Sequence, residues 1–179
     1  MASVTEGIAK VFGKAKGAAK ALEGYPKIFH HLAAEHAEVS TLMTRVASSD
    51  DSAVRDELFP AICKHLLAHA HAEEKEFYPA LNRLPQLAAM VGECLAEHKT
   101  IEAHIDRLKV LSTADPGWAA QFERLVAAVQ QHVEREEQQL FPRASESISD
   151  EQGDELYHSY EDQEEREKAV LDQGTGLSA

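Results

Sequence analysis

The stretch that decides the fold is HAHAEEKEFYP, residues 69–79, which returns 63 positions later as HVEREEQQLFP, residues 132–142. Each copy has a histidine, a glutamate four residues on, a second glutamate directly after it, and then an aromatic residue followed by proline. Upstream of the two copies stand two Glu-His pairs, offset by 62: Glu35-His36 and Glu97-His98. The chain therefore contains a duplicated unit that supplies four imidazoles and two carboxylates, a set suited to a pair of redox metal ions.

The spacing of these residues predicts that they point inward. A histidine and a glutamate four residues apart lie on one face of a helix, with Cβ atoms about 5–6 Å apart. His69 and Glu73 continue the apolar stripe of their segment, and His132 and Glu136 do the same in a later segment. A buried carboxylate without a partner is far more costly than a buried neutral polar group. Imidazoles that bind metal, with the carboxylates bridging two cations, remove this cost.

Helical periodicity runs along nearly the whole chain, and no segment is typical of a strand. Helices are expected at about residues 25–47, from the turn at 48–52 to about 78, between Pro85 and the connector at 113–117, and from 118 to about 142. Pro79 and Pro142 are expected to end their helices, because proline lacks a backbone donor and clashes with the preceding turn. Short links predict an all-α fold, an antiparallel up-down-up-down four-helix bundle with additional terminal helices.

Length and composition exclude several classes of protein. The 179 residues suit one domain, and the net charge of −13 argues against nucleic acid as a partner. No apolar run approaches the ~20 residues that an integral membrane helix needs. Cys63 and Cys94 are expected to be buried thiols of a reducing compartment, and the first residues lack a signal-peptide block, so we expect a cytoplasmic protein. The absence of an exposed apolar stripe predicts a monomer.

The two ends differ from the bundle, which is expected to span residues 25–142. Residues 1–24 contain four lysines and two glutamates at helical spacing with apolar residues, which predicts a basic helical extension. Such a segment either packs on its own bundle or rests on a membrane surface, and we favour the first. Residues 143–179 are expected to form an acidic C-terminal helix and tail, helical over 151–168 and solvated.

At these residues the chain resembles the hemerythrin-like proteins, the family of HHE cation-binding domains, over about residues 25–142. The resemblance implies a four-helix bundle around two iron ions (Fe2+/Fe3+) joined by a bridging oxo or hydroxo group. Glu73 and Glu136 would bridge the irons. The implied ligands are His36, His69, Glu73, His98, His132 and Glu136. Manganese and zinc also suit a mixed imidazole and carboxylate set.

One position departs from the oxygen-carrying members of that family. They have a fifth histidine four residues after the histidine of the third helix, and this chain has Glu102 there. Both metals would then keep an open position, which favours reaction with a bound small molecule over reversible carriage. The pattern resembles the branch linked to peroxide removal, nitric oxide chemistry and iron-centre repair.

Other histidines and glutamates lie beside the inward stripe. Glu102 either reaches a metal or lies at the helix boundary; His65 either lines the pocket or shuttles protons, and His104 caps its edge. The remaining acidic neighbours are solvated or fix a ring nitrogen of a ligand histidine: Glu35, Glu74, Glu97 and Glu137. Four histidines are expected at the surface: His30, His31, His71 and His158.

These features predict a protein that binds and reacts with hydrogen peroxide, dioxygen or nitric oxide in oxidative or nitrosative stress defence. Whether it turns over as a catalase-like or nitric-oxide-consuming enzyme is left open. One alternative is a reversible dioxygen or iron sensor or carrier. The other is an iron-delivery or iron-centre repair protein.

Overall fold

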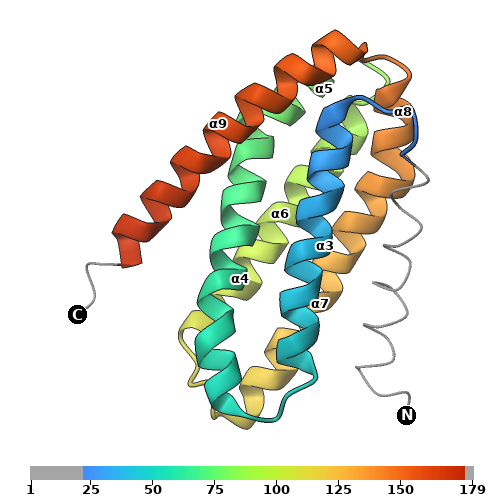
Figure 1. Ribbon diagram of the computed structural model, residues 1–179. Helices are drawn as coiled ribbons and strands as arrows, with labels where there is room; N and C mark the ends of the chain where they lie inside the picture. Colours follow the sequence, from blue (N-terminus) through green and yellow to red (C-terminus); the bar gives the residue numbers. More distant parts are fainter. Residues whose placement is uncertain (1–21, 176–179) are drawn as a thin grey trace.

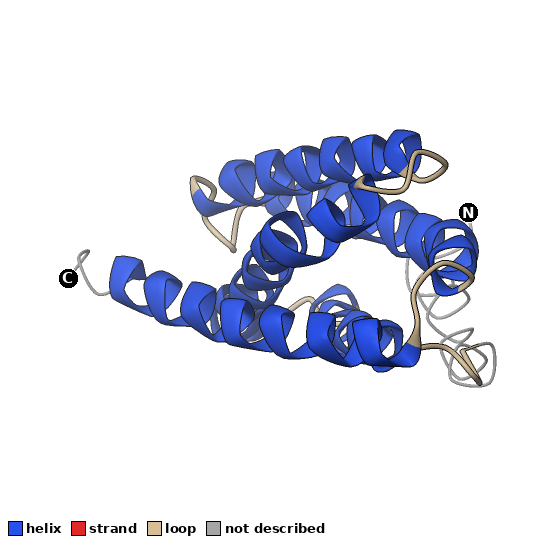
Figure 2. Cartoon of the chain, turned by 90° about the horizontal axis from the view of Figure 1, so that it is seen from above, coloured by secondary structure: helices blue, strands red, loops and turns tan. Residues whose placement is uncertain are grey.

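The structure, a computed structural model, describes residues 22–175, and in that part helices are joined by loops with no strand (Figure 2). The elements are α3 (Lys27–Ala47), α4 (Ser52–Ala72), η1 (Glu73–Phe77), α5 (Tyr78–Asn82), α6 (Ala88–Lys109), α7 (Pro116–Arg135), η2 (Glu136–Leu140), α8 (Phe141–Ser145) and α9 (Asp150–Thr175). The chain runs up and down through α3, α4, α6 and α7 (Figure 1). The predicted four-helix bundle is confirmed, with α9 as a further helix; the expected extension at 1–24 lies almost wholly outside the described residues.

Side-chain caps start two of the four long helices. The Asp51 carboxylate accepts a hydrogen bond from the Ala53 amide at 2.9 Å, at the first turn of α4. Asp115 accepts from the Gly117 amide in the same way at the start of α7, where Pro116 supplies a pre-set φ angle. These caps end the connectors that the sequence predicted at 48–52 and 113–117.

The apolar core is split into two clusters, and the duplicated histidines lie between them. On α3, Leu32 belongs to one cluster and Val39 to the other, with His36 midway. On α6, Cys94 and Ile101 bracket His98 in the same manner. The polar residues therefore form one layer across the middle of the bundle, closed above and below by packed hydrocarbon.

Two π-helical turns, η1 and η2, follow the ends of α4 and α7 that carry His69 and His132. The Tyr78 amide donates to the Glu73 carbonyl and the Phe141 amide to the Glu136 carbonyl, each five residues back. The prediction that Pro79 and Pro142 end their helices was wrong, since α5 and α8 continue past them. The wider turn gives the proline ring room beside the preceding carbonyls, so the helix axis carries on.

The C-terminal segment corrects the expectation of a solvated acidic tail. Helix α9 packs on α3 and α4 and lies along the outside of the bundle (Figure 1). Its buried face is formed by Gly153, Tyr160, Gln163, Glu164 and Glu167, and only its outer face is solvated. No helix among residues 22–175 combines the length and apolar character that crossing a membrane requires.

Candidate metal centre

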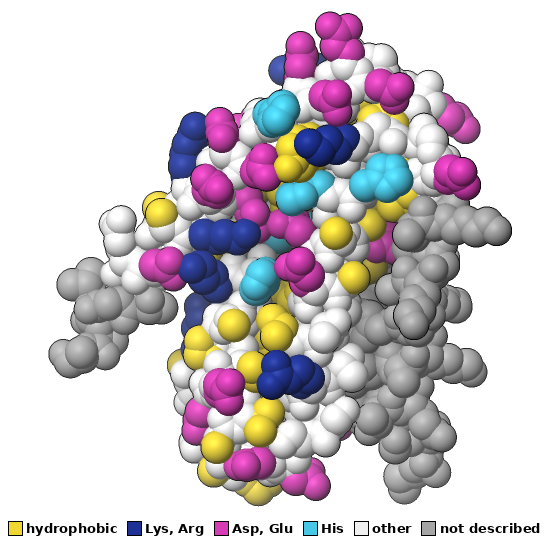
Figure 3. Space-filling view, viewed as in Figure 1, with side chains coloured by type: hydrophobic (Ala, Val, Ile, Leu, Met, Phe, Trp, Pro, Cys, Tyr) yellow, Lys and Arg dark blue, Asp and Glu magenta, His cyan; other side chains and the backbone are white. Residues whose placement is uncertain are grey.

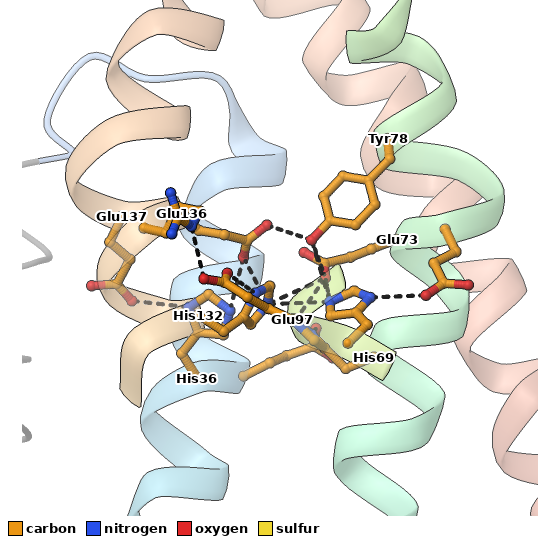
Figure 4. Close-up of polar contacts among 12 residues, drawn as sticks. His36, His69, Glu73, Tyr78, Glu97, His132, Glu136 and Glu137 are labelled. Carbon is orange, nitrogen blue, oxygen red and sulfur yellow. Dashed lines mark hydrogen bonds and ion pairs between the residues drawn. The ribbon is translucent and has the colours of Figure 1, made fainter. Parts of the chain in front are cut away.

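All six residues of the repeated pattern meet in the polar layer of the bundle (Figure 4). α3 brings His36, α6 brings His98, and the ends of α4 and α7 bring the His-Glu pairs. Each glutamate is the first residue of a π turn, directly after the helix that carries its histidine. The four imidazoles and two carboxylates are all buried.

Each carboxylate faces one imidazole from each half of the duplicated chain. Glu73 Oε2 lies 3.3 Å from Nε2 of His69 and 3.2 Å from Nε2 of His98. Glu136 Oε2 lies 3.3 Å from Nε2 of His36 and 3.6 Å from Nε2 of His132. Each glutamate therefore contacts both halves of the duplicated chain through one oxygen, Oε2.

The opposite ring nitrogens, all Nδ1, face a second layer of carboxylates. Within each half, His69 Nδ1 lies 3.0 Å from Glu35 and His132 Nδ1 lies 3.5 Å from Glu97. Between the halves, the pairs and their distances are His36 with Glu137 at 3.0 Å and His98 with Glu74 at 3.1 Å. Of the two readings of these four glutamates, the structure supports the one in which they fix a ring nitrogen. A proton on Nδ1 leaves Nε2 free to bind metal.

In the polar layer, the close contacts between imidazoles and carboxylates favour protonated imidazoles and ionised carboxylates. Burial lowers the pKa of His36, but the carboxylates of Glu136 and Glu137 outweigh burial and raise it to about 9. The same balance, with Glu73 and Glu74 as partners, raises the pKa of His98 to about 9. Burial raises the pKa of Glu73, yet His69 and His98 hold it well below its usual range. Without a cation, protons on the imidazoles would have to neutralise the carboxylates.

The donor set fits a metal. Four buried atoms that point into the layer have no hydrogen-bond partner among the described residues: His36 Nε2, His69 Nε2, Glu73 Oε1 and Glu136 Oε2. A buried polar atom without a partner costs about 1–3 kcal/mol. Mixed nitrogen and oxygen donors from imidazole and carboxylate suit iron, manganese or zinc, and coordination would satisfy all four atoms at once.

Tyr78 is a site residue that the sequence analysis missed. Its hydroxyl donates to Glu136 Oε1 at 2.8 Å and lies 3.2 Å from Glu73 Oε2 and 3.3 Å from His98 Nε2 (Figure 4). α-Helical spacing would place Phe77, four residues after Glu73, on the inward face, and Phe77 is buried in the core beside the layer. The π turn rotates the next residue, Tyr78, onto the face of Glu73. The aromatic-Pro pair after the repeated glutamates was the available signal.

Tyr160 on α9 is the second missed residue. Its hydroxyl donates to Glu35 Oε2 at 2.7 Å and lies 2.9 Å from His69 Nδ1. The extra helix thereby touches the outer shell of the centre. Leu156, Tyr157 and Tyr160 share a helical stripe in the sequence, which could have indicated a packed helix.

The undecided residues lie outside the ligand layer. Glu102 Oε1 lies 3.3 Å from His71 Nε2, and His104 Nδ1 bonds the Gln121 amide at 2.8 Å. His65 lines a cavity beside the centre. His30 and His158 are exposed as expected, whereas His31 and His71 are half-buried with acidic partners, so their assignment to the open surface was wrong.

That cavity has a volume of about 20 Å³, and its apolar lining belongs to the core cluster that contains Val39, whereas Tyr78 belongs to the other cluster. Its apolar wall comes from Val39, Leu66, Val129 and Val133, and its polar wall from Glu35, His36, His65, His69, His132 and Glu164. A space of about 10–15 Å³ holds one water. The cavity therefore has room for one molecule of the size of water or a diatomic gas.

Comparison with known proteins adds a family and one relative. The family model described as the hemerythrin HHE cation binding domain matches residues 27–144. A DNA nickase of Nostoc sp. (strain PCC 7120) is 30% identical over 118 residues, which are 66% of this chain and 33% of the nickase. The chain thus spans about a third of that relative's length. No solved structure matches the chain.

Proposed function

Since the chain belongs to the hemerythrin HHE cation-binding family, we propose that it is a non-haem di-iron protein that binds and reacts with small oxidants. The proposed reactants are hydrogen peroxide, dioxygen and nitric oxide, in oxidative or nitrosative stress defence. The proposed ligands are His36, His69, Glu73, His98, His132 and Glu136. Iron would supply the redox change and the open position for the small molecule.

One observation carries this proposal: buried ligand atoms without hydrogen-bond partners border a cavity of about 20 Å³. The cavity adjoins His36, His69 and His132, so a reactant there would meet the histidine side of the layer. Val39 and Leu66 are buried and form part of the apolar wall of this small cavity, which would admit only a small reactant. Four partner carboxylates hold the imidazoles, and Glu102 leaves the layer without the fifth histidine of oxygen carriers.

Peroxide consumption by the iron-loaded full chain tests the proposal. Removing a ligand in Glu136→Ala or His69→Ala should lower turnover by more than about 100-fold, because outer partners alone are worth about 10–100-fold. Glu134→Ala, an exposed glutamate two residues from Glu136, is the matched control and should retain turnover and metal content. No turnover of peroxide or nitric oxide under any metal loading would sink the proposal.

A reversible sensor is the second candidate, and α9 is the observation that favours it. Through Tyr160, α9 contacts Glu35 and His69, so a change at the centre can be transmitted to an external helix. In that case, adding dioxygen or nitric oxide should alter amide hydrogen exchange in α9 without consuming the ligand. An exchange pattern that stays constant on ligand addition would remove this candidate.

Nicking activity is not carried over from the Nostoc relative, because this chain matches only a third of it. We infer that nucleic acid is not the partner, since a net charge of −13 opposes binding to phosphates. We also place the protein in a reducing compartment such as the cytoplasm. Cys63 and Cys94 support this, because both are buried free thiols.

A further inference from the structure

A second group of metal-ligating side chains lies outside the centre, between α3 and α9. His31 and Glu35 are four residues apart on α3, and His31 Nε2 lies 3.6 Å from Glu35 Oε1. Glu164 reaches them from α9, and one ligand atom of each residue lies within 4.8 Å of the other two. The group therefore repeats the His-x-x-x-Glu spacing of the main centre and adds a carboxylate from another helix.

Two atoms of this group are buried without hydrogen bonds. Neither His31 Nε2 nor Glu164 Oε1 has a hydrogen-bond partner among the described residues, and Glu164 is only 4% exposed. Glu164 Oε1 is instead paired with the Lys168 ammonium, whose Nζ lies 2.5 Å away. The imidazole nitrogen of His31 thus lacks a hydrogen bond, and the carboxylate of Glu164 has a cation as its partner, within 4.8 Å of each other.

The charge at this point also leaves room for a cation. Two carboxylates meet here, and Glu35 already accepts from His69 Nδ1 and Tyr160 through Oε2. Lys168 is the only lysine or arginine paired with either carboxylate among the described residues, so one ammonium serves two carboxylates. A cation between the carboxylates would supply the missing positive charge.

We propose that His31, Glu35 and Glu164 form a third, outer site for a divalent transition-metal ion. One imidazole and two carboxylates are a donor mixture that suits Fe2+, Mn2+, Co2+ or Zn2+, with water filling the remaining positions. The His31 side chain is 25% exposed, so an ion can enter from solvent. Histidine and acidic side chains gather on the upper half of the face in Figure 3, which is the face along which α9 runs.

The outer site is connected to the inner centre through Glu35. Its Oε2 atom accepts from His69 Nδ1 at 3.0 Å, while Oε1 faces His31. One carboxylate thereby orients an inner ligand and binds the outer ion, so the outer site is placed to hold an ion before it enters the centre. The proposal rests on the proposed function only where it connects the outer ion to the inner centre. The outer ligands are not among the six inner ligands.

The structure also indicates which of the two sites should bind metal more tightly. An outer ion must displace the Lys168 ammonium from Glu164, whereas no lysine or arginine pairs with the inner carboxylates Glu73 and Glu136 among the described residues. The outer site is therefore the weaker one. Lys168→Gln removes the ammonium that competes with the ion for Glu164, so outer binding should tighten by about 10-fold or more, a difference of about 1.4 kcal/mol.

Equilibrium dialysis of the full chain against Co2+ tests the proposal, with the bound ions counted at saturation. The wild type should bind three ions per chain, and both Glu164→Gln and His31→Asn should bind two. The amide introduced by Glu164→Gln can still donate to Glu35, so the fold should persist, which circular dichroism verifies. Glu165→Gln, an exposed neighbour on α9, is the matched control and should bind three.

Two results would overturn the outer site: a wild type that saturates at two ions, or variants that still bind three. Failure of the inner centre has a different signature. His132 belongs to the inner layer and not to the outer site. His132→Ala should therefore lower the number of bound ions both in the wild-type background and in the Glu164→Gln background. If His132→Ala changes neither count, the proposed function fails while the outer site stands on its own result.

Discussion

At the scale of single residues, the outer carboxylates contact one nitrogen of each imidazole, Nδ1, and leave Nε2 as the nitrogen that can bind a metal. Glu137 lies 3.0 Å from His36 Nδ1, and Glu35 lies 3.0 Å from His69 Nδ1. A carboxylate at Nδ1 holds the proton there, aims the ring and raises its basicity as a ligand. The metal affinity of the centre should therefore depend on residues that never touch the metal.

Glu137→Ala tests this dependence. Without the carboxylate, His36 loses its orienting partner, and metal affinity should fall by about 10–100-fold. Competition with a chromogenic chelator measures the change. Glu134→Ala, at the end of α7 and three residues before Glu137, removes an exposed carboxylate and should leave affinity unchanged. Equal affinities of Glu137→Ala and the wild type would contradict the role assigned to the outer layer.

Tyr78→Phe should change the unfolding free energy of the metal-free protein more than that of the metal-loaded protein. The Tyr78 hydroxyl donates to Glu136 and approaches Glu73, so its loss leaves buried carboxylates short of a donor. Chelator-treated protein should lose about 1–3 kcal/mol of unfolding free energy. The metal-loaded protein should lose less, because cations then satisfy the same oxygens. Denaturant unfolding with and without metal measures both values, and equal losses would count against this account.

At the scale of helices, the π turns explain why the site was only partly predictable from sequence. The His-x-x-x-Glu pairs were predictable because α-helical spacing holds up to Glu73 and Glu136. Beyond them, α-helical spacing fails: at about 100° per residue, a residue five positions on turns away from the glutamate. In a π turn the residue five positions on lies on the same face as the glutamate. This is why Tyr78 was missed and why Pro79 does not end the helix.

A C-terminal helix was predicted and α9 confirms it, but its packing on the bundle was missed for another reason. Its sequence is strongly acidic, and composition alone favoured a solvated tail. Its buried face contains glutamates, which a hydrophobic pattern does not detect; Glu164 and Glu167 are buried because lysines and polar groups face them. The duplicated unit, in contrast, was visible without any structure, because its repeats stand at nearly constant offsets.

Gly153→Ala tests the docking of α9. A Cβ atom at Gly153 would lie 2.2 Å from the Pro26 Cβ atom, and the rigid proline ring cannot yield easily. Overpacking costs about 1–3 kcal/mol, more than the gain of up to about 1 kcal/mol in helix propensity. We expect a lower Tm and faster amide exchange in α9. Gly92→Ala, with open space at its Cβ position, is the control, and the same loss in both variants would contradict the contact.

At the scale of the whole molecule, the polar layer makes stability depend on pH. Burial lowers the pKa of His36 and His98, but their carboxylate partners outweigh it and raise each pKa to about 9. An unfolded histidine has a pKa of about 6.5, so this stabilisation is complete below about pH 6.5 and is lost as pH rises through about 9. The loss is on the order of 3 kcal/mol for each imidazole as an upper limit.

Urea unfolding of chelator-treated protein between about pH 6 and 9 should therefore show falling stability. Metal affinity should show the opposite trend, because binding displaces the protons of the imidazoles. A metal-free chain whose stability stays level or increases over that range would show that the carboxylates do not hold His36 and His98 in the protonated form.

The central claim is a redox-active di-iron centre across the middle of the bundle, and one absorbance measurement tests it most directly. The full chain is loaded with Fe2+ without air, verified to hold iron in the inner layer by its loss in His132→Ala, and mixed with dioxygen. We predict rapid conversion to a ferric charge-transfer spectrum that vacuum does not reverse. A lasting coloured adduct that disappears under vacuum, or no spectral change, would contradict the account.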